Sequence, residues 1–440
     1  MARRQEKFAV GIDVVRKHSL NTASAAAPSE DLIPTRNGDQ GHQRIATIAI
    51  ASALCFGLYF PYFLNEVGIL RMYMVAVGIL ILFVESARRG RSAQSWPLLV
   101  LACGAVLVGY RLSLWLGVQF DDNDVSLNLQ RFGIVLPIYL MVGRSIWNSK
   151  RLSIYLTTIV VWSAGVSALA ILEVQRRRSL FGRDEVFSSL FRDGQIRALL
   201  ATEHALVLGT ILAATIPFVW KTKLRFRLGI SLLLLAGTYA TGSLGPICIA
   251  AAAVVIRPNG KAAKWLAKQS KKLRFGLLLF FSVFAYFCVA VWEPVIYGAS
   301  GREYSTGYRS AMYSFLPETL LEKPIGFGIG SIPQGIWTFY SASHGSRDVS
   351  NTVDSELFHL ALLFGIPGVL LFAYALFLAI RCLRTDRALG ISLFSVTGAG
   401  FFLSLHSWDT LGPFWYLLAG AAFAVTRGSV ESGCSTKRTK

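Results

Sequence analysis

Paired cysteines are missing from this sequence: its six cysteines are scattered and none forms a CxxC pair. Most of them fall inside apolar runs, so we expect neither a disulfide framework nor a metal site. Charged residues are also scarce, at 16% of the chain. The basic N-terminus lacks the short apolar core and small-residue cleavage site of a signal peptide, so none is expected there.

Apolar residues dominate instead. They make up 53% of the chain, and the mean hydropathy is +0.50, whereas soluble domains are usually less apolar. Several apolar runs approach the ~20 residues that a helix needs to cross a bilayer. The sequence therefore predicts an all-α, polytopic transmembrane helical bundle. A net charge of +19 would suggest nucleic acid binding in a soluble protein, but basic cytoplasmic loops explain it better here.

The apolar runs predict about twelve membrane spans. The least certain pair lies in 228–256, where TYATGSLGP is either a tight hairpin or a break in one long helix. The expected spans are 45–64, 67–85, 97–116, 128–147, 152–172, 198–220, 228–241, 243–256, 275–293, 355–380, 389–406 and 414–426.

The loops between the spans predict the orientation. With the N-terminus inside, every cytoplasmic loop is basic, whereas the outer loop 117–128 is acidic, as the positive-inside rule requires. We therefore expect a protein of the cytoplasmic (inner) membrane with both termini in the cytoplasm. Residues 1–42 and 428–440 are predicted to be cytoplasmic tails, the first of them disordered, on either side of a transmembrane domain over 43–427.

The largest outer loop covers residues 294–354. Loops this long are rarely simple connections. Apolar residues recur at helical spacing in its first half, so we expect a short amphipathic helix there. Those residues are Tyr308, Met312, Phe315 and Leu316.

A second outer segment, 174–197, carries six arginines and no lysine. A guanidinium group binds phosphate through two parallel hydrogen bonds, which a lysine ammonium does not. These arginines, with the triplet Arg176, Arg177 and Arg178 among them, therefore suggest a site for an anionic group. The alternative is a solvated loop whose arginines pair with nearby carboxylates or contact lipid headgroups.

Several ionisable side chains fall within spans or at their ends, where a charge is costly and often functional. A carboxylate or imidazole at the top of a helix is placed to take a proton from an attacking hydroxyl group. Each residue also has a structural alternative. Arg131 could form an ion pair with the acidic outer loop, and the carboxylates and histidines could form hydrogen bonds between helices or simply pack. The residues concerned are Arg131, Glu203, His204, Asp354, Glu356 and His359.

Three segments together resemble a known family. The first is QIRALLATEHALVLGTILAATIPF (195–218), and the second is LLLLAGTYATGSLGPICIA (232–250). The third is SGREYSTGYRSAMYSFLPETLLEKPIGFGIGS (300–331) followed by TVDSELFHLALLFGIPGVLLF (352–372). Their order and spacing resemble the O-antigen ligase and Wzy-type polysaccharide polymerase family over about residues 130–380.

The resemblance implies a membrane-embedded glycosyltransferase of the bacterial cell envelope. Such enzymes transfer a glycan from an undecaprenyl-pyrophosphate donor to an acceptor hydroxyl at the outer face of the cytoplasmic membrane, with no metal or other cofactor. Arginines of the outer loops hold the pyrophosphate. The family pattern places Arg197 and Arg302 in this role, with Arg309 as the neighbouring alternative to Arg302.

The sequence departs from the family pattern at two places. Ser243-Leu244-Gly245 stands where the family often has Ser-Arg-Gly. Asp354-Ser355 stands where ligases have a catalytic His-Asn, and some polymerases have an aspartate. The second departure favours a polymerase of exopolysaccharide or O-antigen type, with Asp354 as the catalytic residue and Glu356 or His359 assisting.

Three alternatives stay open. One is a ligase that uses another acceptor. A transporter or flippase of lipid-linked oligosaccharide is another, although no convincing internal repeat of the kind common in transporters is present. The third is a structural subunit of a polysaccharide assembly complex. If the chain is itself an enzyme, the other members of such a complex are its expected protein partners. Nucleic acid is not expected as a partner.

Overall fold

The computed structural model describes residues 36–64, 69–89, 122–181, 197–256, 260, 302–330, 335–341, 345–348 and 353–435. The chain divides into two compact units, Met1–His42 and Gln43–Lys440. Of the first unit, only the start of one helix is described. The fold below is that of the second unit. The spans expected at 97–116 and 275–293 lie outside the described residues.

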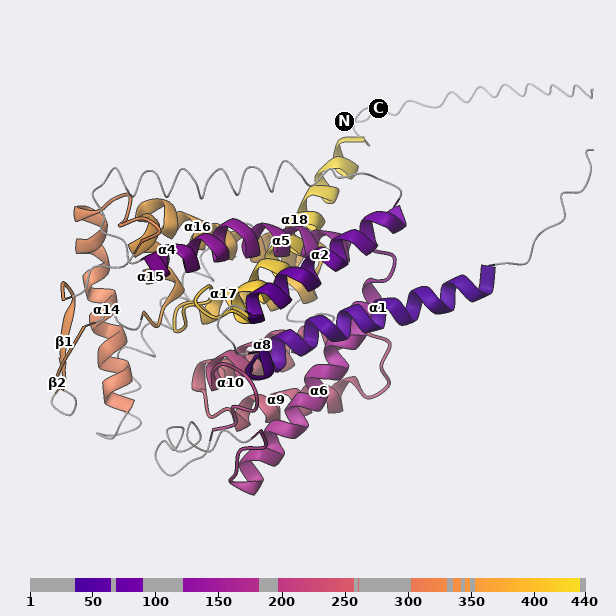
Figure 1. Cartoon of the computed structure of the whole chain (residues 1–440), viewed down its shortest axis with the longest axis horizontal. Helices are drawn as coiled ribbons and strands as arrows, with labels where there is room; N and C mark the ends of the chain where they lie inside the picture. Colours follow the sequence, from indigo (N-terminus) through magenta and orange to yellow (C-terminus); the bar gives the residue numbers. More distant parts are fainter. Residues whose placement is uncertain are drawn as a thin grey trace, which may run out of the picture. The chain divides into compact units, whose positions relative to one another are not determined.

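Helices form almost all of the described structure (Figure 1). A π-helix, Leu129–Val135, joins α4 to α5, and a short 3-10 helix, Pro61–Leu64, follows α1. The α-helices are α1 (Arg36–Tyr59), α2 (Ile69–Arg89), α4 (Asp122–Asn128), α5 (Leu136–Trp147), α6 (Leu152–Arg176), α8 (Ala205–Val219), α9 (Arg227–Ala240), α10 (Leu244–Ile256), α14 (Arg302–Glu322), α15 (Glu356–Phe364), α16 (Ile366–Thr385), α17 (Arg387–Ala399) and α18 (Leu411–Ser435).

Four of these helical stretches are long and apolar enough to cross a membrane: Ile69–Arg88, Val125–Trp147, Leu152–Arg176 and Ile366–Thr385. Shorter apolar helices accompany them, namely α8, α9, α10 and the first part of α18. The protein is therefore a multi-pass membrane protein, as the composition predicts. Large apolar side chains such as Met72 and Phe83 of α2 are more than two-thirds exposed in the isolated chain, as expected for residues that face lipid.

The segment 228–256 forms two helices rather than one. α9 ends at Ala240, α10 begins at Leu244, and the two helices pack against each other. Gly242, in the turn, has a φ of +61°, a conformation that glycine adopts at little cost. The hairpin interpretation of TYATGSLGP is therefore the correct one.

Three expected spans are interrupted or shortened. The span at 355–380 is broken into α15 and α16 at Gly365, which has a φ of +62° and lies two residues before Pro367. The span at 389–406 ends as a helix at Ala399, and residues 400–410 are not helical. The span at 198–220 becomes helical only at Ala205. Hydropathy did not reveal these breaks because the non-helical residues are themselves mostly apolar.

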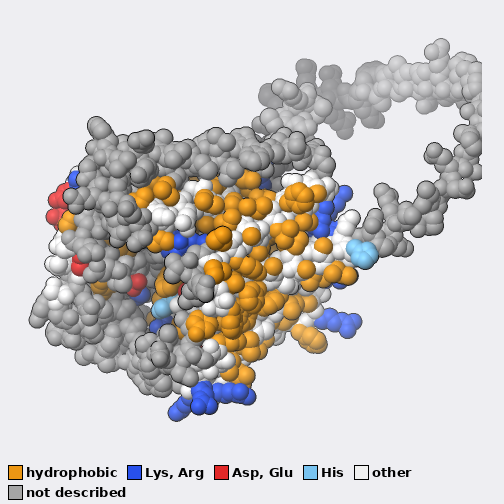
Figure 2. Space-filling view, viewed as in Figure 1, with side chains coloured by type: hydrophobic (Ala, Val, Ile, Leu, Met, Phe, Trp, Pro, Cys, Tyr) orange, Lys and Arg blue, Asp and Glu red, His pale blue; other side chains and the backbone are white. Residues whose placement is uncertain are grey.

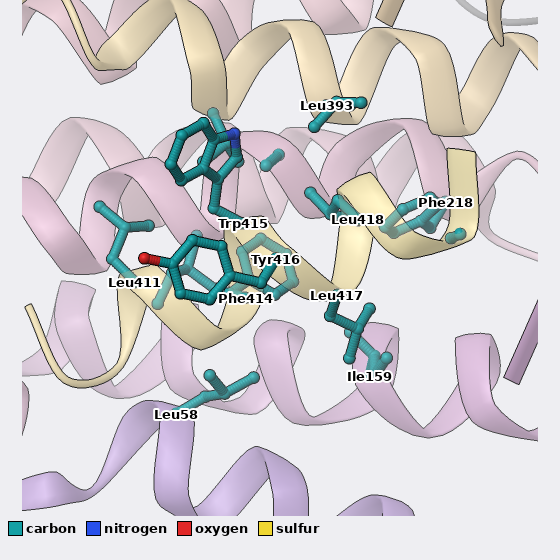
Figure 3. Packing of buried hydrophobic residues seen from close by; sticks show 14 of the residues in the cluster. Leu58, Ile159, Phe218, Leu393, Leu411, Phe414, Trp415, Tyr416, Leu417 and Leu418 are labelled. Carbon is teal, nitrogen blue, oxygen red and sulfur yellow. The ribbon is translucent and has the colours of Figure 1, made fainter. Parts of the chain in front are cut away.

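Buried side chains of α1, α6, α8, α17 and α18 form part of the core of the bundle (Figure 3). α5 and α18 approach each other very closely because glycines face the partner helix. A Cβ atom on Gly143 would lie 1.9 Å from the Leu417 carbonyl oxygen, and one on Gly420 would lie 2.0 Å from that of Leu140. Such contacts between small residues let helix backbones come together and gain van der Waals energy.

Outside the bundle, α14 runs across the direction of α2 and α16, beside a two-stranded hairpin (Figure 1). The antiparallel strands β1 (Thr338–Ser341) and β2 (Gly345–Asp348) pair Thr338 with Asp348. α14 carries the amphipathic pattern expected of the outer loop. Its Tyr308 and Met312 are buried in a small second core, together with Trp337, Phe358 and Leu362.

Hydrophobic side chains cover a broad area of the bundle's surface (Figure 2). Exposed examples come from three candidate spans: Ile79 on α2, Val161 on α6 and Leu370 on α16. A soluble monomer rarely exposes a continuous apolar surface this extensive. The surface therefore supports the membrane assignment independently of helix length.

The close approach of α5 and α18 predicts a specific sensitivity. We expect Gly420→Ala to destabilise the purified protein by about 1–3 kcal/mol, because the new methyl group overlaps the Leu140 backbone and the helices must separate. Thermal unfolding in detergent, followed by circular dichroism, measures the effect. Gly165→Ala on α6 is the control, since its methyl group would meet no atom within 4 Å. Equal melting temperatures for the two variants would refute the close contact.

Candidate functional site

The non-helical segment 400–410, between α17 and α18, organises the polar part of the bundle. We call it the α17–α18 loop. It carries His406 and Asp409 and is held by the Glu356 side chain at the start of α15. Glu356 Oε2 accepts hydrogen bonds from the backbone N–H groups of Leu405 (2.7 Å) and His406 (3.1 Å). The Glu356 carboxylate also lies 2.8 Å from His406 Nδ1, and both side chains are fully buried.

Glu356 therefore has its carboxylate oxygens committed to the loop. A buried carboxylate is tolerated only when it is paired and hydrogen-bonded, and here two N–H donors and an imidazole meet that need. Its backbone N–H adds a bond to the Gly400 carbonyl oxygen at 2.7 Å. Because these contacts occupy the carboxylate, Glu356 positions the loop rather than presenting a base to a substrate.

A second carboxylate, that of Glu203, holds the other end of the same loop. Glu203 precedes α8 and accepts hydrogen bonds from Asp409 N–H (3.1 Å), Thr410 N–H (3.3 Å) and the Thr410 hydroxyl group (2.7 Å). Burial raises the pKa of Glu203 to about 7, with a further contribution from the Asp409 carboxylate, although the bonds from Thr410 and Asp409 oppose the change. Glu203 thus tethers this loop instead of pairing with its neighbour His204.

Arg131 and Arg71 meet at Asp409 of the loop. Arg71 Nε donates to Asp409 Oδ1 at 2.8 Å, and Arg131 Nε lies 3.5 Å from the same oxygen. Arg131 also donates from Nη2 to the Ser407 carbonyl oxygen at 2.6 Å. Arg131 therefore pairs with Asp409, which lies far from it along the chain.

His359, on α15, also faces this loop. Its Nδ1 lies 2.9 Å from Ser404 Oγ and 3.3 Å from Ser407 Oγ, and its ring packs edge-on against His406 with 4.2 Å between centroids. The imidazole is therefore held within the loop's hydrogen-bond network. This arrangement matches the packing alternative for His359 more closely than direct contact with an acceptor.

Arg197 lies across the turn between α9 and α10. Its Nε donates to the Thr241 carbonyl oxygen at 2.9 Å, its Nη2 donates to Ser243 Oγ, and Ala198 N–H bonds to the Ala240 carbonyl oxygen at 2.8 Å. Close packing also explains the glycine in this turn, because a Cβ on Gly242 would lie 2.9 Å from Arg197 Cγ. The turn thus fixes the direction of the Arg197 guanidinium group.

A polar cluster forms where three separate segments meet. His204 caps the N-terminus of α8, Arg309 comes from α14, and Asp354 precedes α15. Burial, together with the positive charges of Arg197 and Arg309, lowers the pKa of His204 to about 4. Burial raises the pKa of Asp354, and the Arg309 guanidinium group opposes this change. We call Arg197, His204, Arg309 and Asp354 the outer cluster, because the sequence predicts that Arg309 belongs to the outer loop 294–354.

Arg309 has a property that points to a ligand. Its Nε is buried and has no hydrogen-bond partner among the residues that the structure describes. A buried donor without a partner costs free energy of about 1–3 kcal/mol. Nearby contacts hold this region in place: Tyr313, one turn further along α14, bonds through Oη to the Phe401 carbonyl oxygen at 2.6 Å and contacts Ser355 Oγ at 2.8 Å.

Other expected site residues lie elsewhere. Arg176, Arg177 and Arg178 are exposed at the C-terminal end of α6, where Arg177 has a φ of +50°. Arg302 is the first residue of α14, and its side chain lies outside the described part of the structure. Buried Glu173 links this end of α6 to Arg197's segment, since its Oε2 accepts from Leu199 and Leu200 N–H.

The sequence reasoning missed four polar residues of the α17–α18 loop: Ser404, His406, Ser407 and Asp409. The available signal was the segment LSLHSWDT (403–410), which places a histidine and an aspartate between two apolar runs. It was overlooked because the first half of this segment was assigned to a span. Within the described ranges, no group of three or more His, Cys, Asp or Glu side chains is placed to hold a metal ion.

These features define a helical multi-pass membrane protein with a polar site assembled from α8, α14, α15 and the α17–α18 loop. No protein-family model matches the chain, and no curated protein matches its sequence.

The raised pKa of Glu203 predicts a pH effect on stability. Its folded-state pKa of about 7 exceeds the ordinary value of 4.5, so the folded protein binds more protons between these values. Stability should therefore decrease as pH rises from about 4.5 to 7, by on the order of 2 kcal/mol from this group. Unfolding measured across this range should show a shallower decrease for Glu203→Gln than for the wild type. Glu318→Gln, at an exposed site on α14, is the control, and an unchanged slope in Glu203→Gln would contradict the assignment.

Proposed function

We propose that this protein is a polysaccharide polymerase. It transfers a glycan from an undecaprenyl-pyrophosphate donor to a sugar hydroxyl group at the outer face of the cytoplasmic membrane. The observation that carries the proposal is the outer cluster, in which two arginines, a histidine and a carboxyl group come together from the segments where the family resemblance placed them. The orientation with cytoplasmic termini, argued from the basic loops, belongs to the same proposal.

The arginines bind the donor's diphosphate. Arg197 is oriented by its bonds to the α9–α10 turn, and Arg309 has a buried Nε without a described partner. Guanidinium groups bind phosphate oxygens through paired hydrogen bonds and neutralise charge that develops on a leaving diphosphate. Arg302 lies two turns before Arg309 on the same helix and assists from there. The exposed triplet Arg176, Arg177 and Arg178 attracts the anionic headgroup before it binds.

Asp354 is the general base. Its raised pKa, caused by burial, makes the carboxylate a better proton acceptor. As the acceptor hydroxyl group attacks the anomeric carbon, its proton passes to Asp354, a new C–O bond forms, and the bond from the anomeric carbon to the diphosphate oxygen breaks. Undecaprenyl pyrophosphate leaves, and direct displacement inverts the anomeric centre.

The sequence predicted that Glu356 or His359 assists the reaction directly. We assign both residues a different role. Glu356 has its carboxylate occupied by the α17–α18 loop, and His359 lies against Ser404. Both act as positioning residues. His204, whose pKa is low, stays neutral at physiological pH and so adds no further positive charge beside Arg197 and Arg309.

The clamp predicts the effect of a conservative change. Arg309→Lys keeps the charge but removes the paired hydrogen bonds to the diphosphate, so we expect kcat/KM to fall by about 10²–10³-fold. Purified protein in nanodiscs with a lipid-linked repeat unit supplies the assay, with release of undecaprenyl pyrophosphate and longer glycans as the readouts. Arg225→Lys, at an exposed site between α8 and α9, should retain full activity. Full activity of Arg309→Lys would rule out this clamp.

The base predicts a separation of binding from chemistry. We expect Asp354→Asn to bind the donor with unchanged affinity while transfer slows by at least about 10²-fold, since the amide cannot accept the proton. Donor binding by tryptophan fluorescence and single-turnover glycan extension measure the two steps. An unchanged rate of extension would remove Asp354 from the mechanism. Movement of intact donor across proteoliposomes without extension in the wild type would instead identify a transporter.

A further inference from the structure

Apolar side chains are exposed at the C-terminal end of α14 and in the turn that follows it. Leu321 is 85% exposed, the largest exposed fraction of any large hydrophobic side chain in the described structure, and Ile325 is 46% exposed. Earlier on the same helix, Tyr308 and Met312 are buried in the second core. One end of α14 thus presents apolar surface that the described residues leave uncovered. We call residues 321–325 the α14 end.

The α14 end is fixed to the break between α15 and α16. Ile366 N–H donates to the Pro324 carbonyl oxygen at 2.8 Å, and Phe327 N–H donates to the Leu362 carbonyl oxygen at 2.7 Å. The two segments are in such close contact that a Cβ atom on Gly365 would lie 2.1 Å from the Pro324 oxygen. The position of the α14 end along the bundle is therefore set by the start of α16.

This attachment places the α14 end at a membrane boundary. The candidate membrane-spanning stretch of α16 begins at Ile366, the residue that bonds to Pro324. Exposed large side chains recur along α16 every three or four residues and so form one stripe on the helix: Ile366, Leu370, Tyr374 and Phe377. Lipid covers a stripe of this kind on a membrane span. Because Ile325 directly follows Pro324, the apolar surface continues from the stripe onto the α14 end.

Charged residues beside Leu321 indicate how deep it lies. Glu318 and Glu322 are exposed, and Lys323 Nζ lies 5.9 Å from the centroid of the Phe327 ring. Charged groups remain solvated at the level of the lipid headgroups but are costly in the hydrocarbon core. In addition, α14 runs across the direction of α16 (Figure 1), as a helix that lies in the plane of the membrane interface does. These features indicate the headgroup layer.

A lipid surface explains the α14 end better than a protein partner does. Stable protein–protein interfaces bury about 1,200–2,000 Å² in total and are centred on a cluster of apolar anchors. The α14 end offers only two exposed large apolar side chains, Leu321 and Ile325, among charged ones. A headgroup layer admits a few apolar side chains without requiring a matching surface.

We propose that the α14 end is an interfacial anchor, in which Leu321 and Ile325 insert between the phospholipid headgroups at this end of the bundle. In the orientation proposed above, these belong to the outer leaflet. The partner is the same lipid that surrounds the exposed stripe of α16. The anchor holds one end of the helix that carries Arg309 and Tyr313, while the second core holds the remainder.

Photo-crosslinking tests the contact directly. The full-length protein, with p-benzoylphenylalanine in place of Leu321, is reconstituted in nanodiscs of phosphatidylethanolamine and phosphatidylglycerol and irradiated. We expect phospholipid adducts on the α14 peptide in mass spectrometry, because the benzophenone group reacts with C–H bonds next to it. Leu370, in the exposed stripe of α16, is the positive control. Ser346 is the negative control, since it is exposed on β2, which lies on the side of α14 away from α16 (Figure 1).

Each outcome of the crosslinking decides the proposal. Lipid adducts at Leu321 and Leu370 but not at Ser346 support the anchor. Lipid adducts at Leu370 alone overturn it, as do equal lipid adducts at Leu321 and Ser346. Adducts from Leu321 to a second copy of the chain, or to another segment of the same chain, identify a protein surface there and also overturn it.

Leu321→Gln tests whether the contact stabilises α14. Because Leu321 is exposed, the change leaves the protein core intact. We expect amide hydrogen exchange in the last two turns of α14 to become faster in nanodiscs by on the order of tenfold, since an apolar side chain is lost from the interface. Leu321→Met, which stays apolar, and Ser346→Gln should exchange as the wild type does. Unchanged exchange in Leu321→Gln would refute the anchor. None of these measurements involves glycosyl transfer, so their outcome is distinct from that of the proposed function.

Discussion

The rest of the polar structure depends on one buried carboxylate. Glu356 lies at the first position of α15, and its oxygens hold the backbone of Leu405 and His406 and the His406 ring. Removing an ion from water costs several kcal/mol unless paired groups offset it, and here every compensating group belongs to the α17–α18 loop. The loop and the helix start therefore stabilise each other. Glu203 fastens the far end of the loop through Thr410, and these two attachments determine where Asp409 lies.

The attached loop separates two polar regions. On one side, Asp409 gathers Arg71 and Arg131 around a small pocket that Tyr416 also lines. On the other side, Trp408 stacks near His204, with 5.5 Å between ring centroids, and so contacts the outer cluster. Both regions contain guanidinium groups, which hold anions with directional hydrogen bonds.

Sequence reasoning predicted some of this site correctly and some of it not. It placed an amphipathic helix in the outer loop, and α14 buries Tyr308 and Met312 as expected. It offered a hairpin at 228–256, which the structure contains. It assigned similar roles to Asp354, Glu356 and His359, because all three lie within two turns of sequence. Their surroundings differ: Asp354 lies near Arg309, whereas Glu356 and His359 bind the α17–α18 loop. It also left out His406 and Asp409, which hydropathy had placed in or beside a span.

The sequence by itself determined that the chain enters the membrane repeatedly as helices. Hydropathy and charge bias act over one helix at a time, so a local reading captures them. Only the tertiary structure decided which charged groups are satisfied and which remain available. Glu356 meets its partners 49 and 50 residues away, and Glu203 meets Asp409 across 206 residues. A hydrogen bond depends on the positions of two atoms to within tenths of an ångström, and the order of residues along the chain does not contain those positions.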